Sequence, residues 1–111
     1  MARVAHYRTC VQRVIAQYGA YQPINDASER QVIFDAEHDH YLLMTVGWRE
    51  KERRYACLLH VDIKDDKIWI QQDGTEDGIA TKLVELGIPK QDIILAFHAP
   101  YKWKYTGFGT A

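Results

Sequence analysis

The sequence predicts an α+β protein: an N-terminal helix, a four-stranded antiparallel meander, a second helix and a short C-terminal aromatic segment. Apolar residues recur at helical spacing over residues 3–18, and they alternate with other residues over residues 31–35 and 41–48. Residues 55–87 contain a strand, a tight turn, a strand and a helix in succession. Because the connections between strands are too short for parallel crossovers, we expect antiparallel pairing, with both helices covering one face of the sheet.

Composition predicts one folded domain over residues 1–111, since 47% of the residues are hydrophobic and 26% are charged. Cys10 and Cys57 lack metal-type spacing, so reduced thiols and no cofactor are expected. No apolar run reaches membrane length, which predicts a cytoplasmic protein without membrane association. The net charge of −1 argues against a stand-alone DNA-binding protein, because phosphate neutralisation needs a positive excess.

The first helix is predicted over residues 3–18, with Gly19 as its terminator. The link over residues 20–30 is rich in turn and loop formers, namely Pro23, Asn25, Asp26 and Ser28. A turn at residues 36–40 separates the first two strands. A charged loop at residues 49–54 then leads into the third strand.

The hairpin within residues 55–73 has a register that side chains alone predict, because they alternate between faces along a strand. A two-residue loop at Asp65 and Asp66 pairs Lys64 with Lys67, Ile63 with Ile68, Asp62 with Trp69 and Val61 with Ile70. One face then carries Cys57, Leu59, Val61 and Ile63, and the other carries Leu58, His60, Asp62 and Lys64. A slip by one residue would place apolar side chains opposite polar ones.

The second helix is predicted to have Thr75 or Asp73 as its N-cap and Gly87 as a left-handed C-cap. Gly78 in its first turn would weaken it by about 1 kcal/mol relative to alanine. Residues 93–97 are apolar but too few for periodicity to separate strand from coil.

The second face of the sheet is too apolar to lie comfortably in water. We expect it to carry Ile33, Tyr41, Leu43, Leu58 and Trp69, beside His60, Asp62 and Gln71. Contiguous apolar surface of this kind marks a protein–protein interface. The alternative is that the C-terminal tail, residues 99–111, folds back and seals the face.

The tail itself mixes aromatic and basic side chains, with Lys102, Trp103, Lys104 and Tyr105 in succession. Such a pattern suits base stacking with phosphate contacts, and it equally suits packing at a protein interface.

Two further groups of residues suggest metal chemistry. Asp62 and Lys64 form a D-x-K pattern on a strand, with Asp35 upstream, as in metal-dependent nucleases. The immediate turn after Lys64 and the turn-forming character of the acidic residues favour a solvated hairpin end instead. His38 and His40 could bind a metal with His60, but exposed turn residues are the simpler interpretation, and no metal site is predicted.

Several stretches together form a recognisable pattern: residues 31–35, Tyr41 with Gly47 and Trp48, residues 60–100 and the closing residues 105–108. In these stretches the sequence resembles the XisI family, the fdxN element excision controlling factors found mainly in cyanobacteria. Lys104, Gly107 and Gly109 depart from the family's terminal pattern.

The resemblance implies a regulatory protein of site-specific DNA excision that acts with a recombinase and an XisH-type companion, and it supplies no catalytic residues. Together with the apolar second face, it predicts a non-enzymatic accessory protein that forms a homo-oligomer or binds such a companion. A DNA-binding accessory that uses the tail is the second hypothesis, and a metal-dependent nuclease is a disfavoured third.

Overall fold

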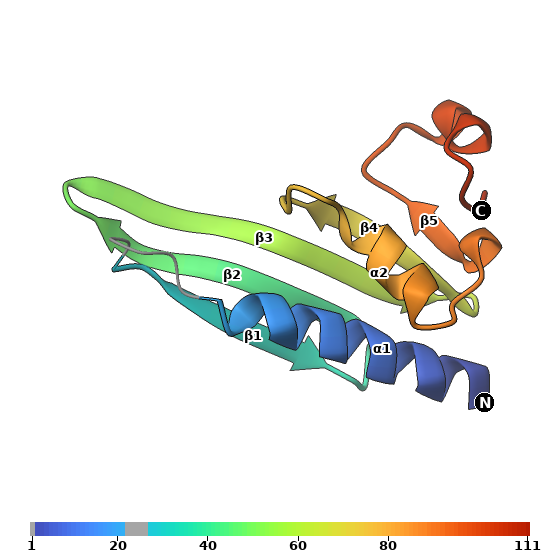
Figure 1. The fold of residues 1–111 in the computed structure, drawn as a ribbon, viewed down its shortest axis with the longest axis horizontal. Coiled ribbons are helices and arrows are strands. Elements are labelled where there is room, and N and C mark those ends of the chain that lie inside the picture. The colour runs from blue at the N-terminus through green and yellow to red at the C-terminus, as the bar shows by residue number, and fades with distance from the viewer. Residues whose placement is uncertain (1, 22–26) are drawn as a thin grey trace.

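The computed structural model describes residues 2–21 and 27–111 (Figure 1). Over these residues the chain forms, in order, α1 (Ala2–Gly19), β1 (Glu29–Asp35), β2 (His40–Arg49), β3 (Glu52–Lys64), β4 (Lys67–Asp73), α2 (Ile79–Glu85), the 3-10 helix η1 (Lys90–Asp92), β5 (Ile93–Leu95) and the 3-10 helix η2 (Pro100–Tyr105). The predicted α+β class and first helix are confirmed. The predicted turn residues Pro23, Asn25 and Asp26 lie outside the described residues.

The strands follow their sequence order in the sheet, β1-β2-β3-β4-β5, and α1 and α2 pack on one face, as predicted (Figure 1). The core lies between these two layers. Its members from α1 are Tyr7, Cys10, Val11, Val14 and Ile15, and those from the central strands include Tyr41, Leu43, Leu59, Val61, Ile68 and Ile70. In the described part of the chain, no helix has the length and apolar character of a membrane span.

The hairpin of β3 and β4 has the predicted register, with Lys64 opposite Lys67 and Asp62 opposite Trp69. Asp65 and Asp66 have φ angles of 55° and 60°, the left-handed values that a two-residue type I′ turn requires at both positions. Short polar side chains tolerate this conformation, and the buried Ile63 and Ile68 fix the phase of both strands.

The sheet differs from the predicted meander in its last strand. The apolar segment after η1 forms β5, which lies parallel to β4 and pairs Ile68 with Ile93 and Trp69 with Ile94. The segment that contains α2 supplies the crossover that parallel pairing needs, a connection that the prediction did not consider. Ile93 and Ile94 are fully buried, which explains why β5 shows no alternation in its sequence.

The ends of α2 depend on two glycines. Gly78 is the N-cap residue at φ 78°, outside the helix, so the predicted weakening of the first turn is wrong. Gly78 thus stands where Thr75 or Asp73 was predicted as N-cap. The Asp73 carboxylate still accepts hydrogen bonds from the backbone N–H groups of Thr75 (2.9 Å) and Ile79 (2.8 Å). Gly87 confirms the predicted left-handed C-cap at φ 98°, with Ile88 N–H donating to the Leu83 carbonyl.

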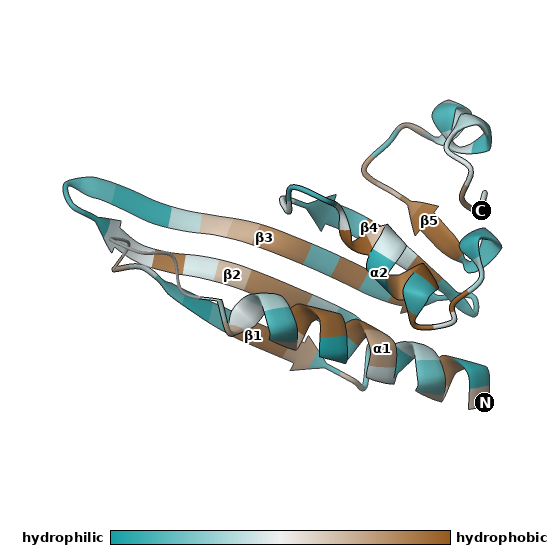
Figure 2. Cartoon of the chain, viewed as in Figure 1, coloured by the Kyte–Doolittle hydropathy of each residue, from teal (hydrophilic) through white to brown (hydrophobic). Residues whose placement is uncertain are grey.

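The β2–β3 hairpin is longer than predicted. The expected loop over residues 49–54 is a two-residue turn, because Arg49 pairs with Glu52 and Trp48 with Arg53. Figure 2 shows hydrophilic residues at this hairpin tip and apolar ones along the middle of β2 and β3. The tip extends beyond α1 and α2 (Figure 1), which agrees with its hydrophilic residues.

A bulge in β3 changes which side chains point toward the helices. Leu59 pairs with Leu43 but Cys57 pairs with Met44, so Leu58 is an extra residue in β3. Cys57 consequently lies on the same face as Met44 rather than on the core face where the sequence placed it. A regular strand through Leu58 would have kept the predicted phase.

A polar network joins α1 to the turn between β1 and β2. The Arg8 guanidinium donates to the Asp39 carboxylate at 2.7 and 2.9 Å, and the Tyr41 hydroxyl donates to it at 2.8 Å. Hydrogen bonding to Arg8, followed by that to Tyr41, lowers the pKa of Asp39 against the opposing effect of its burial. The network therefore holds the N-terminal half of α1 against the turn.

We expect Asp39→Asn to lower the free energy of unfolding by about 2 kcal/mol, the contribution of hydrogen bonds to a charged group. Asparagine tolerates the left-handed backbone of Asp39 (φ 58°), so the loss reports the carboxylate. Because the folded pKa is lowered, the contribution is complete above the unfolded value of 3.8 and is lost as the pH falls through the folded value. Urea unfolding at neutral and acidic pH measures both effects.

The matched control is Asp65→Asn, which makes the same chemical change at φ 55° in an exposed turn. Its effect should stay within about 0.5 kcal/mol. Equal losses in the two variants would show that the Arg8–Asp39–Tyr41 network contributes no specific stability.

Candidate functional site

The face of the sheet opposite the helices forms the candidate site, and we call its part over β1, β2 and β3 the open face. Cross-strand pairing brings Ile33 of β1 next to Leu42 of β2, and Met44 of β2 next to Cys57 of β3. Leu42 and Met44 are half-buried, whereas Ile33 is 47% exposed and Tyr55, farther along β3, is 67% exposed. The open face thus offers a band of apolar side chains that no described element of this chain covers.

The structure changes which residues make up this face. Tyr41 and Leu43 are fully buried in the core beneath the helices, so their predicted place on the second face is wrong. The reason is that the turn between β1 and β2 is one residue shorter than predicted. Asp35 pairs with His40, so Ile33 lies opposite Leu42. The predicted turn over residues 36–40 would have placed Ile33 opposite Leu43. Such a shift exchanges the two faces of a strand. Phe34 and Tyr41 are cross-strand partners in the structure. A predicted register that paired these two aromatic residues would have placed Leu42 and Met44 on the open face.

The other three predicted residues have different surroundings. Ile33 is exposed on the open face, and Leu58 occupies the bulge, half-buried against the core. Trp69 is 9% exposed because the ring of Trp103 packs edge-on against it at 5.9 Å and the Lys64 ammonium lies 4.4 Å from its ring centre. Trp69 is thus part of the packing between β4 and the tail.

The tail seals one end of the sheet and leaves the open face uncovered. The Trp103 indole N–H donates to the His98 carbonyl at 3.0 Å, and the Gly109 N–H donates to the Ile93 carbonyl at the outer edge of β5 at 2.8 Å. A Cβ atom at residue 109 would lie 2.2 Å from the Gln91 carbonyl oxygen, so this close approach requires glycine. Of the predicted nucleic-acid contacts, Lys102, Lys104 and Tyr105 are exposed and Trp103 is half-buried.

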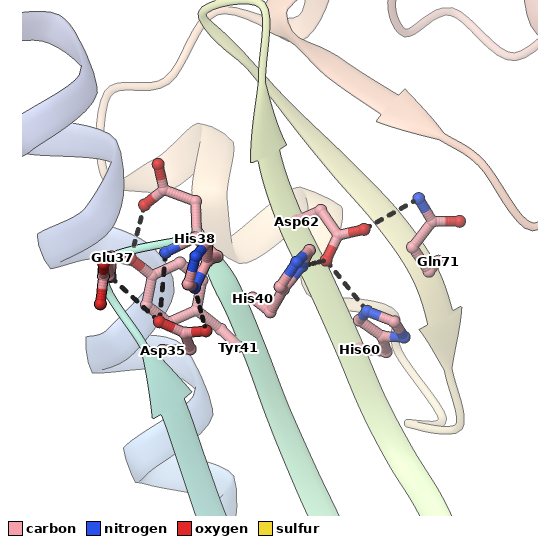
Figure 3. A network of polar contacts seen from close by, with 9 residues as sticks. Asp35, Glu37, His38, His40, Tyr41, His60, Asp62 and Gln71 are labelled. Atoms are coloured by element: carbon pink, nitrogen blue, oxygen red, sulfur yellow. Dashed lines mark hydrogen bonds and ion pairs between the residues drawn. The ribbon is translucent and has the colours of Figure 1, made fainter.

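Figure 3 shows a polar cluster centred on Asp62. It lies next to the apolar band, because His60 is the cross-strand partner of Leu42. His40 Nδ1 lies 2.7 Å and His60 Nε2 lies 2.9 Å from the same carboxylate oxygen, Asp62 Oδ1. The Gln71 amide donates to the other oxygen, Oδ2, at 3.3 Å. The hydrogen bond with Asp62 raises the pKa of His40 above its usual value, with a further contribution from the charge of Asp62. The cluster therefore holds one carboxylate between two imidazoles.

The nuclease-like residues are engaged elsewhere. Asp35 accepts from the backbone N–H groups of Glu37 and His38 and lies 2.9 Å from the His38 ring, and these hydrogen bonds lower its pKa. Lys64 lies over the Trp69 ring, and Asp62 belongs to the histidine cluster. The described contacts thus place Asp35, Asp62 and Lys64 in three separate groups, not in one metal-holding constellation.

One cysteine has a histidine neighbour that sequence reasoning missed. Cys10 Sγ lies 3.6 Å from His6 Nε2, one turn earlier on α1, at the i, i+4 spacing that brings helical side chains together. Burial raises the pKa of the Cys10 thiol, so the neutral form is favoured rather than the nucleophilic thiolate. Cys10 therefore serves as a buried core residue, with the exposed His6 at its edge.

The fold and the site define a class: two-layer α+β proteins whose sheet is covered by helices on one face and largely bare on the other. Comparison with known proteins identifies the family. The XisI protein family matches residues 1–110, and the chain belongs to it. No curated protein sequence matches the chain.

Two solved structures are similar over nearly the whole chain, and both come from Anabaena variabilis ATCC 29413. The first is a XisI-like protein, with a TM-score of 0.89 and 42% identity over 96% of this chain and 98% of that one. The second is the fdxN element excision controlling factor XisI, with a TM-score of 0.84 and 35% identity over 98% of this chain and 99% of that one. The expected family resemblance is confirmed.

The hydrogen bond between His40 and Asp62 allows a prediction about the pKa of His40. We expect NMR to show a His40 pKa above the ordinary value for histidine, and we expect Asp62→Asn to lower it because the negative acceptor is gone. Since the folded pKa is raised, the stabilisation by this pair is complete below the unfolded value of 6.5 and is lost as the pH rises through the folded value. An unchanged His40 titration in Asp62→Asn would contradict the hydrogen bond.

Proposed function

We propose that this chain is a non-enzymatic accessory protein that regulates a DNA-processing complex by binding other proteins through its open face. The observation that carries the proposal is the apolar band over β1, β2 and β3, which no described part of the chain covers. The similar protein from Anabaena variabilis is an fdxN element excision controlling factor, which supports a regulatory role in DNA excision. Its partner would be a second copy of the chain or an XisH-type companion that acts with a recombinase.

The chemistry of the open face suits protein association. Leu42 and Met44 form its half-buried centre, and Ile33, Trp48 and Tyr55 expose large apolar surfaces around them. Arg53 lies 5.5 Å from the Trp48 ring centre and 5.8 Å from that of Tyr55. Aromatic residues, methionine and arginine are the types that protein interfaces favour.

Met44→Glu should abolish association, because it places a charge in the centre of the apolar band while its half-exposed position spares the core. The measurement is size-exclusion chromatography with light scattering, on the chain alone and co-expressed with an XisH-type protein from the same genome. Loss of the larger species in either experiment supports the open face and identifies the partner.

The control is Phe97→Glu, because Phe97 is a large apolar residue, 46% exposed, that lies after β5, away from the open face. It should leave association unchanged. An oligomer or complex that survives Met44→Glu but is lost with Phe97→Glu would refute the open face as the interface.

A second candidate function is DNA binding by the tail, because Lys102, Lys104 and Tyr105 expose their side chains on η2. Replacing both lysines by alanine should weaken retention on heparin and on duplex DNA and reduce its salt dependence, since each lysine neutralises a phosphate. Lys90→Ala together with Lys51→Ala is a charge-matched control on exposed positions outside η2. Equal effects of both pairs would indicate nonspecific electrostatics rather than a tail-borne site.

A further inference from the structure

We propose that His40, His60 and Asp62 form a binding site for a transition-metal dication of the zinc class. Each of the three side chains offers one ligand atom, and these atoms all lie within 4.8 Å of one another. The site lies on the open face next to its apolar band, and it does not depend on the protein-binding role proposed above (Figure 3).

The backbone holds the three ligands in fixed positions. His40 and Asp62 are cross-strand partners on β2 and β3, and His60 precedes Asp62 by two residues, on the same face of β3. Both strands lie inside the sheet, with β1 beyond β2 and β4 beyond β3. The ligand set therefore rests on paired backbone rather than on a loop, which favours a preformed site.

The side-chain geometry is already convergent. His40 Nδ1 and His60 Nε2 both face Asp62 Oδ1, so the two imidazoles approach one carboxylate oxygen from two sides. A zinc ion bonds imidazole nitrogen and carboxylate oxygen at about 2.0–2.2 Å, which in a tetrahedron separates neighbouring ligand atoms by about 3.3 Å. The present separations of 2.7 and 2.9 Å need small side-chain rotations to admit the ion.

A fourth residue orients the carboxylate. Gln71 donates to Asp62 Oδ2, the oxygen that faces away from the imidazoles, at 3.3 Å. Gln71 is the extra residue at a bulge in β4, because His60 pairs with Gln72 and Val61 with Ile70. Bulges re-aim side chains, and hydrogen bonds to a ligating carboxylate fix its orientation.

The ligand types select the metal. Two imidazoles and one carboxylate suit zinc, cobalt and nickel, whereas calcium and magnesium take oxygen ligands. The exposed fractions of the side chains are 51% for His40, 34% for His60 and 19% for Asp62, so an ion can enter from solvent. Three protein ligands also leave a coordination position for water.

The test is isothermal titration of the full, metal-free chain with zinc chloride. We expect about one zinc per chain, with affinity reduced more than about tenfold in His60→Ala and Asp62→Ala, and by about tenfold in Gln71→Leu. Magnesium chloride should produce no binding heat. The control is His38→Ala, which removes an exposed histidine engaged with Asp35 and should leave zinc affinity unchanged.

A second measurement needs no variant. Zinc should raise the melting temperature of the wild-type chain, reversibly with EDTA, and should shift the ring resonances of His40 and His60 ahead of those of His38 and His98. The proposal is overturned if zinc does not bind, if His60→Ala and Asp62→Ala bind it as tightly as the wild type, or if His38→Ala abolishes binding.

Discussion

The placing of α1 and α2 on the same face of the sheet is the constraint on which the rest of the structure depends. It explains why the fully buried side chains of the central strands, such as Tyr41, Leu43 and Val61, lie on that face. Among the described residues, the tail covers part of the sheet beside that face: it reaches β4 through Trp103 and β5 through Gly109. The open face is therefore a consequence of how the helices are distributed.

Local chemistry made much of the fold predictable. The β3–β4 register follows from Val61, Ile63 and their cross-strand partners. Gly87 ends α2 because glycine readily adopts the left-handed conformation of a helix C-cap. Both features depend on residues close together in sequence, where turn geometry and alternation act directly. β5 was missed because its pairing with β4 depends on a crossover, and three buried residues carry no period.

The candidate site was less predictable, because two small irregularities control it. A four-residue connection between Asp35 and His40 sets the phase of β2, and the bulge at Leu58 resets the phase of β3. The first exchanges Tyr41 and Leu43 for Leu42 and Met44 on the open face, and the second moves Cys57 onto that face. The His40–Asp62 pair depends on the same phase, so sequence reasoning recognised the individual residues but not their convergence on one oxygen.

The hydrogen bond from Gly109 to Ile93 has a consequence for how sheets of this kind can grow. It occupies the outer edge of β5 with the chain's own backbone, whereas β1 forms the opposite edge and exposes Val32, Ile33 and Phe34. A strand from another chain could therefore add to the β1 edge of this sheet but not to the β5 edge. Joining β1 to β1 about a two-fold axis would use the available edge of both chains, so edge pairing of this kind would stop at two chains and would not continue into a fibre.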